Sequence, residues 1–285
     1  MRSPECFYIE QKCNERTDIP VFHDDQHGTA IISGAALLNS MELTGKQIDE
    51  IKVVFSGAGA AGFSCAKYFL GLGVRPENLI MTDIDGVVYK GRGDNNYLDE
   101  IAVDTNVRTL AEALHDADVF LGVSVPGVLK PEMLKNMNKD PVIFAMANPV
   151  PEIDYPLAMQ TRSDVIMGTG RSDYPNQINN VSAFPYIFRG ALDSNSSSIN
   201  EAMKHAATNA IAALAYKTVD EEAGFDGKDL EFGKRYIIPK PFDRRLLIDV
   251  SVAVAKAAMS TGVAQRELDI EKYTQQLKTL IHLNG

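Results

Sequence analysis

The sequence of 285 residues contains no tryptophan, only three cysteines and no long uninterrupted run of apolar residues. Because three cysteines (Cys6, Cys13 and Cys65) cannot all pair within one chain, the composition does not fit a disulfide-dense secreted scaffold. No apolar stretch reaches the roughly 20 residues that a helix needs to span a bilayer, and no secretory signal opens the sequence. We therefore expect a cytoplasmic protein with no membrane partner.

Basic residues are also in short supply. The 28 Lys and Arg residues stand against 38 Asp and Glu residues, which gives a formal net charge of −10, and no basic cluster stands out. A nucleic acid is not an expected partner, because binding a phosphate backbone requires a basic surface. With 45% hydrophobic and 23% charged residues, the chain can bury the core of one or two globular domains.

Short apolar runs alternate with helical patterns along the middle of the chain. Strands are predicted at 51–55, 78–82, 119–123, 142–146 and 165–167, with helices near Leu110, Glu132 and Leu157. Longer helices are predicted at 3–16, 30–43, 63–72, 200–217 and 246–259. This alternation indicates an α/β fold with a doubly wound parallel sheet of the Rossmann type, flanked by N- and C-terminal helices. We expect an N-terminal helical segment at 1–48 and a domain containing the sheet at 49–285.

A glycine-rich turn connects the first predicted strand to its helix, with the sequence Gly57-Ala58-Gly59-Ala60-Ala61-Gly62. In a dinucleotide-binding turn the first glycine permits the tight turn, the second lets the backbone approach a pyrophosphate, and the third lets the helix pack on the strand. Asp83 ends the next predicted strand, where a ribose-binding acid belongs. We therefore predict a dinucleotide site; a purely structural turn is the alternative.

Asp83 also bears on the choice of cofactor. A carboxylate at the ribose accepts hydrogen bonds from its hydroxyls and repels the extra 2′-phosphate of NADP⁺, so the sequence leans towards NAD⁺. Lys90 and Arg92 are the nearest cations along the chain, and either could reverse this preference by folding back over the ribose.

The run His23-Asp24-Asp25-Gln26-His27 places two imidazoles and two carboxylates just before a predicted buried helix. Asp is a good helix N-cap, which explains one carboxylate. The second carboxylate beside it suffers like-charge repulsion unless a cation or a catalytic role is present, and Mg²⁺ and Mn²⁺ prefer such oxygen ligands. A functional site and a simple helix start both remain open at this point.

Two asparagines, Asn148 and Asn180, lie just past predicted strands. In an open α/β sheet, ligands bind in the crevice beyond the carboxyl ends of the strands. Asparagine in loops also serves turn chemistry, so the position alone does not separate a ligand contact from a turn residue.

Several motifs together resemble bacterial-type malic enzyme over essentially the whole chain. They are Pro4-Glu5-Cys6-Phe7, the segment from Ile19 to Ala30 that contains His-Asp-Asp-Gln-His-Gly-Thr-Ala, the glycine turn, Ala147-Asn148-Pro149, Gly170 to Asn180 and Ile238 to Asp243. The His-Asp-Asp-Gln-His-Gly-Thr-Ala run is far more specific than the glycine turn.

The resemblance implies oxidative decarboxylation of malate to pyruvate and CO₂, with NAD⁺ or NADP⁺ and Mg²⁺ or Mn²⁺ as cofactors. It implies that Asp25 is a metal ligand with Asp24 beside it in the catalytic site. It places Asn148 and Asn180 near the substrate and the nicotinamide, and the glycine turn and Asp83 at the rest of the dinucleotide. Malate and pyruvate are the expected small-molecule partners, and a homo-oligomer, typically a dimer, is the expected assembly.

The sequence also departs from the family pattern. Family members carry a preceding domain that supplies a catalytic Tyr and Lys, followed by a Glu-Asp pair that completes the metal site, and Met1 stands where that stretch would join. We therefore expect little activity from this chain alone. A non-catalytic nucleotide-binding or interaction protein derived from the same fold is the alternative. A third reading, another amino-acid or 2-hydroxy-acid dehydrogenase, is disfavoured by the His-Asp-Asp-Gln-His-Gly run.

Overall fold

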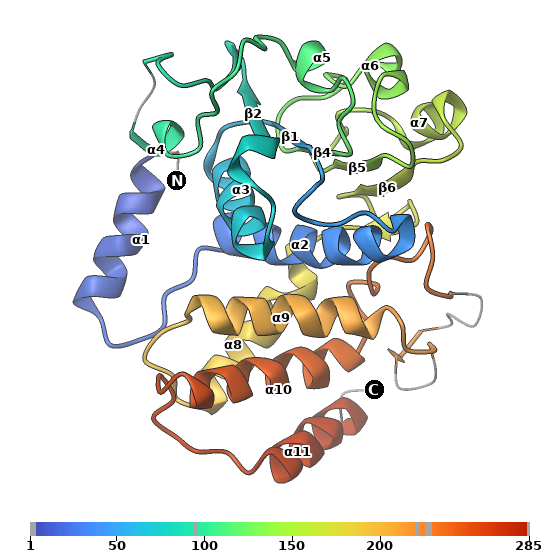
Figure 1. Cartoon of the computed structure of the whole chain (residues 1–285). Helices are drawn as coiled ribbons and strands as arrows, with labels where there is room; N and C mark the ends of the chain where they lie inside the picture. The colour runs from blue at the N-terminus through green and yellow to red at the C-terminus, as the bar shows by residue number, and fades with distance from the viewer. Residues whose placement is uncertain (1–3, 94–95, 220–222, 226–229, 284–285) are drawn as a thin grey trace.

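The computed structural model describes residues 4–93, 96–219, 223–225 and 230–283, and it contains one central sheet with helices on both faces (Figure 1). The sheet has seven strands in the order β3-β2-β1-β4-β5-β6-β7. All neighbours pair in parallel except β3, which is antiparallel to β2. The strands are β1 (Val53–Ser56), β2 (Leu79–Asp83), β3 (Gly86–Val87), β4 (Val119–Gly122), β5 (Val142–Ala145), β6 (Ile166–Thr169) and β7 (Asn176–Gln177). The α/β, doubly wound architecture predicted from the sequence is confirmed.

The helices also follow most of the predicted pattern. They are α1 (Glu5–Arg16), α2 (Asp24–Thr44), α3 (Ala60–Leu72), α4 (Asn96–Asp99), α5 (Leu110–Ala113), α6 (Pro131–Lys135), α7 (Tyr155–Thr161), α8 (Phe184–Asp193), α9 (Glu201–Leu214), α10 (Arg245–Ser260) and α11 (Ile270–Leu283), with short 3₁₀ turns η1 (Pro76–Asn78) and η2 (Asn180–Ser182). Sequence patterns did not predict α4, α8, α11, β3 or β7. Ser3, the predicted start of the first helix, lies outside the described residues. The boundary between 48 and 49 stays a prediction.

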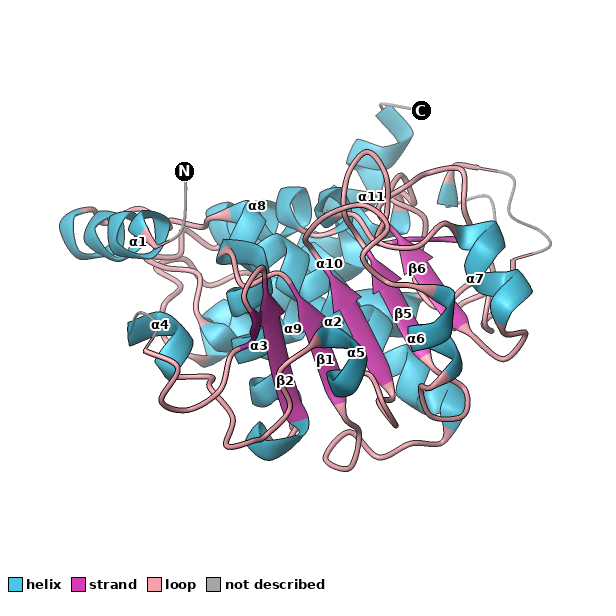
Figure 2. Cartoon of the chain, turned by 90° about the horizontal axis from the view of Figure 1, so that it is seen from above, coloured by secondary structure: helices cyan, strands magenta, loops and turns pink. Residues whose placement is uncertain are grey.

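Side chains alternate between the two faces of the sheet, and each face has its own core. On β1, Val53 and Phe55 pack with α2, α3, α9 and α10, whereas Val54 packs with α5, α6 and α7. Viewed from above, the sheet lies between these two helical layers (Figure 2). Because both faces are covered, the central strands β1, β4, β5 and β6 are buried along their whole length, as parallel strands usually are.

The chain reverses its direction of travel across the sheet at β1. From β1 it moves outwards to β2, and it then returns to place β4 on the other side of β1. The connections that leave the carboxyl ends of β1 and β4 therefore run to opposite sides. This leaves a crevice between these two strand ends. A ligand site is expected at this edge of the sheet.

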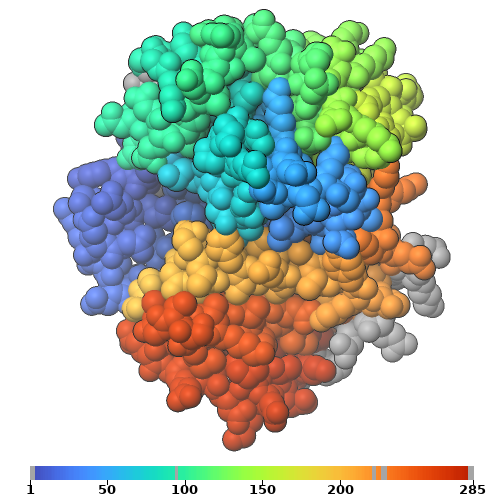
Figure 3. Space-filling model, in the orientation of Figure 1, coloured from blue at the N-terminus to red at the C-terminus, as the bar shows by residue number. Residues whose placement is uncertain are grey.

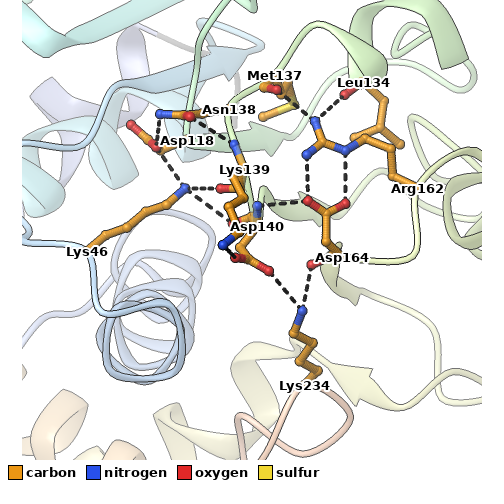
Figure 4. Close-up of polar contacts among 10 residues, drawn as sticks. All are labelled: Lys46, Asp118, Leu134, Met137, Asn138, Lys139, Asp140, Arg162, Asp164 and Lys234. Carbon is orange, nitrogen blue, oxygen red and sulfur yellow. Dashed lines mark hydrogen bonds and ion pairs between the residues drawn. The ribbon is translucent and has the colours of Figure 1, made fainter.

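The opposite edge, at the amino ends of β4, β5 and β6, is closed by charged side chains (Figure 4). Lys46 donates to Asp118 at 2.8 Å, and Arg162 binds both carboxylate oxygens of Asp164 at 3.0 and 2.6 Å. The Arg162 Nη1 also donates to the carbonyls of Leu134 and Met137. These contacts connect the amino ends of the strands. The carboxyl edge of the sheet is therefore the edge at which a functional site is expected.

Among the described residues, no helix combines the length and the apolar character that a bilayer crossing requires.

Candidate functional site

The glycine turn lies at the carboxyl end of β1, beside β4. Gly57 has φ +114°, and a Cβ added there would lie 2.8 Å from the Val123 carbonyl oxygen. A Cβ added at Gly62 would lie 1.8 Å from the Gly57 carbonyl oxygen, which no side chain can tolerate. The tight turn and the close packing expected of these two glycines are therefore built into the fold.

Gly59 differs from its two neighbours because an added Cβ would meet nothing within 4 Å. It is the N-cap of α3, a helix of 13 residues, and no side chain caps this helix start. Backbone N–H groups at such an end bind phosphate well, since they carry the positive end of the helix dipole. The open space at Gly59 fits the predicted approach of a pyrophosphate, and the roles of Ala58, Ala60 and Ala61 stay predictions.

Asp83 lies at the end of β2, and Arg92 from the following loop binds it in a bidentate pair. The Nη1–Oδ1 and Nη2–Oδ2 distances are 3.0 and 2.5 Å, and Nη1 also donates to the carbonyls of Gly86 and Val87. Burial opposes ionisation of Asp83, but the Arg92 hydrogen bonds and the backbone N–H of Asp85 outweigh it and lower its pKa below the ordinary value. The predicted ribose acid is therefore an ionised carboxylate whose charge is compensated.

Asp24 and Asn180 come together although 156 residues separate them. The Asn180 Nδ2 donates to Asp24 Oδ2, and the carboxylate lies over Gly28, where an added Cβ would be 2.0 Å from Oδ1. Asp24 Oδ1 is buried and has no hydrogen-bond partner among the described residues. Burial, followed by the charge of Asp25, raises the pKa of Asp24, and the Asn180 hydrogen bond opposes this shift.

Asp25 behaves differently from its neighbour. Its side chain is 79% exposed and lies 3.9 Å from the His23 Nε2. The N-cap of α2 is His23, with no side-chain cap, so neither aspartate serves as the cap that the simple helix-start reading required. Within the residues that the structure describes, no group of three or more His, Cys, Asp or Glu side chains could hold a metal ion. Asp25 as a metal ligand stays a prediction.

Asn148 follows β5, and its side chain lies against Gly170, which follows β6. A Cβ added at Gly170 would be 3.1 Å from Asn148 Oδ1. The Asn148-Pro149 peptide bond is cis. Asn148 thus lies beyond the carboxyl ends of two neighbouring strands, and Asn180 follows β7 at the same edge. Among the described residues, no hydrogen bond joins Asn148 to the Asp24–Asn180 pair.

Two carboxylates near this edge were not predicted. Glu152 is fully buried and accepts hydrogen bonds from the backbone N–H groups of Ser124 and Ala147, which follow β4 and β5, while its burial raises its pKa. Glu10 on α1 accepts from the His23 backbone N–H at 3.0 Å and pairs with His27 Nε2 at 2.9 Å. Neither residue lies in a recognisable motif, so only the folded geometry reveals them.

Comparison with known proteins decides what kind of fold unit this is. Residues 26–225 match the family model described as the NAD-binding domain of malic enzyme. The chain belongs to the malic enzyme family. It is therefore a malic enzyme NAD(P)-binding domain, as its resemblance implied.

Family members with either cofactor are similar to this chain. It is 52% identical to an NADP-dependent malic enzyme of Rhizobium meliloti, covering 97% of this chain and 37% of that protein. It is 49% identical to an NAD-dependent malic enzyme of the same organism, covering 100% of this chain and 38% of that protein. The crystal structure of malic enzyme from Pyrococcus horikoshii aligns with a TM-score of 0.88 at 38% identity, over 99% of this chain and 64% of that one. The chain thus spans little more than a third of these two curated relatives.

Proposed function

We propose that this chain is the cofactor-binding part of an enzyme that oxidises and decarboxylates malate to pyruvate and CO₂, using NAD⁺ or NADP⁺ and Mg²⁺ or Mn²⁺. The observation that carries the proposal is the position of the Asp24–Asn180 pair. It lies at the carboxyl edge of the same sheet whose β1 bears the dinucleotide turn. A polar pair of this kind can orient a small hydroxy acid beside a nicotinamide.

The donor atoms of the described residues are of the kind that a hard divalent cation prefers. They are too few to hold the cation alone. Asp24 Oδ1 has no hydrogen-bond partner within the described part of the chain, and the carboxylate of Asp25 beside it is exposed. Oxygen donors of this kind suit Mg²⁺ and Mn²⁺, which would take further ligands from water, substrate or another part of a longer protein. When bound, the cation would stabilise negative charge on the C2 oxygen of the substrate.

Each residue then has a definite task. The α3 N-terminus and Gly59 bind the pyrophosphate, and Asp83 accepts hydrogen bonds from the ribose. Asn180 holds the Asp24 carboxylate in one orientation, so that Asp24 faces the substrate with a fixed oxygen. Asn148 would donate to the substrate or to the carboxamide of the nicotinamide. When bound, the nicotinamide ring would supply the acceptor for the C2 hydride.

The Asp83–Arg92 pair modifies the lean towards NAD⁺. Because Arg92 compensates the charge of Asp83, a 2′-phosphate at the ribose meets a guanidinium as well as a carboxylate. We propose that the site accepts both cofactors and that Arg92 supplies the interaction with the phosphate of NADP⁺. A homodimer and the small molecules malate and pyruvate are the proposed partners.

Two measurements on the 285-residue chain test the proposed function. Calorimetric titration should show binding of NADP⁺ and NAD⁺ at one site per chain, and the absence of binding for both would overturn the proposal. A steady-state assay with malate, Mn²⁺ and either cofactor should show little turnover from this chain alone, because the chain spans only 37% and 38% of the length of the two curated relatives. Cofactor binding unaffected by malate and Mn²⁺ would favour the non-catalytic alternative.

A further inference from the structure

A cavity of about 430 Å³ lies where α1, α2, α3 and α9 meet. In the space-filling view, α1 forms one side of this region, with α3 and α9 beside it (Figure 3). None of residues 57–62 lines it, and neither does Asp24, Asn148 or Asn180. The cavity is therefore distinct from the site assigned to the dinucleotide and the substrate.

The polar end of this cavity is built on a buried lysine. Lys204 on α9 is only 7% exposed, and its Nζ donates to Glu201 Oε1 at 2.9 Å and contacts His27 Nδ1 at 3.1 Å. An ammonium has three N–H donors, so these two contacts leave one donor over. The Glu201 side chain is 70% exposed, and water therefore screens much of its attraction for the lysine.

The His27 ring bridges Lys204 and a second carboxylate, that of Glu10. Since Lys204 donates to Nδ1, the proton of the neutral ring is on Nε2, which donates to Glu10 Oε1 at 2.9 Å. Glu10 thus lies across the imidazole from the ammonium, and the charge of Lys204 contributes to lowering the pKa of Glu10. Burying an ammonium is costly unless an opposite charge is in contact with it. Here the carboxylate in direct contact is that of Glu201, which water screens.

The remaining walls are largely aromatic, although Gln26, Ser64 and Lys67 also line the cavity. The rings of Phe7 and Phe63 meet edge to face with centroids 5.2 Å apart, and Tyr68 stacks on His205 at 5.0 Å. A Cβ added at Gly71 would still be 3.8 Å from His205 Nε2, so this glycine keeps part of the wall open. Aromatic walls of this kind favour a planar apolar body over a compact polar one.

We propose that this cavity is a second binding site, for a small monocarboxylate with an aromatic or similarly flat apolar body. The carboxylate would accept the remaining Lys204 N–H and supply the close, desolvated negative charge that Glu201 does not provide. The body would lie between the Phe7–Phe63 and Tyr68–His205 pairs. The volume is in the range of small-molecule sites.

Phenylacetate is a suitable probe, with phenylacetamide as its neutral match of nearly the same shape. Titration of the 285-residue chain, followed by calorimetry or ligand-observed NMR, should show one phenylacetate per chain and about tenfold or more weaker binding of the amide. Binding should persist when the chain is saturated with NADP⁺. Displacement of phenylacetate by NADP⁺, equal affinity for acid and amide, or no binding of the acid would each overturn the proposal.

Three variants locate the site. Lys204→Met keeps the length of the side chain and should weaken phenylacetate binding about tenfold or more. Lys67→Met is the matched control, because Lys67 lines the same cavity but is 51% exposed and pairs with Glu100, so its loss should change the affinity little. Gly71→Leu fills the cavity and should abolish binding while NADP⁺ still binds. Equal losses from Lys204→Met and Lys67→Met would show general attraction to cations and would contradict the site.

Discussion

The Arg92 guanidinium holds both carboxylate oxygens of Asp83, at 3.0 and 2.5 Å, where β2 ends. This pair turns an isolated negative charge at the expected ribose position into a compensated one. It also makes Arg92 the residue on which cofactor choice can be tested directly.

Replacing Arg92 with methionine should shift cofactor preference towards NAD⁺. Loss of the guanidinium leaves Asp83 uncompensated, so NADP⁺ affinity should fall about tenfold or more relative to that of NAD⁺. Lys90→Met is the matched control, since Lys90 is exposed and lies two residues away. Dissociation constants for both cofactors at one ionic strength decide the matter, and an unchanged ratio for Arg92→Met would exclude a role for Arg92 in phosphate recognition.

The glycine turn allows ligand binding and folding to be separated. Gly59→Val should leave the unfolding transition close to that of the wild type, because the new side chain enters open space, yet it should block the pyrophosphate and abolish NADP⁺ binding. Gly62→Val should instead destabilise the fold, since its Cβ would overlap the Gly57 carbonyl oxygen. Urea unfolding combined with calorimetry tests both variants. Normal NADP⁺ binding by folded Gly59→Val would contradict the assignment of the turn.

The Asp24–Asn180 contact should be visible as a coupling energy. Asn180→Ala removes the hydrogen bond to a half-buried carboxylate and should lower the free energy of unfolding by about 1–3 kcal/mol. In the background of Asp24→Asn, whose side chain is neutral, the same substitution should cost less. A double-mutant cycle from urea unfolding measures the difference, and strictly additive losses would show that the two side chains do not interact.

The Arg162–Asp164 ion pair, at the amino ends of the strands, predicts a pH dependence of stability. Hydrogen bonds from Arg162 lower the pKa of Asp164 from 3.8 to about 2. Since the folded pKa lies below the unfolded one, this pair stabilises the fold above about pH 4, and the stabilisation disappears as the pH falls towards 2.

Arg162→Met should therefore reduce the free energy of unfolding at neutral pH by roughly 2 kcal/mol, and by less as the solution is acidified. Arg171→Met is the control, because Arg171 and Asp173 form a pair of the same spacing whose side chains are 38% and 55% exposed, so that water screens the pair more and it should contribute little. If the difference between Arg162→Met and the wild type did not shrink on acidification, Asp164 would not be the group responsible.

The sequence predicted the elements that have a strong local signature. Val53 to Phe55 is a short β-branched and aromatic run followed by the glycine turn, and a strand here was predicted from that pattern alone. The two-residue strand at Gly86 could not, because so short a segment has no periodicity. Its pairing depends on β2 being in place beside it.

The residues of the candidate site also divide into those that the sequence predicted and those that only the fold reveals. Gly57 and Gly62 were predictable because their backbone geometry excludes other residues. Arg92 was named as a cation that could fold back over the ribose, but its bidentate pair with Asp83 was not predicted, because the pair depends on how the loop after β3 folds. Glu152 was missed because a buried carboxylate that binds backbone N–H groups has no sequence pattern of its own.

Both outer strands of the sheet, β3 and β7, are only two residues long. A second copy of the chain can extend a sheet only by pairing with a run of unpaired backbone groups, and strands this short offer very few. Self-association through continuous β-structure is thus disfavoured by the architecture. We expect a dimer to form through helical surfaces, where Tyr8 on α1 and Leu192 on α8 are exposed apolar side chains.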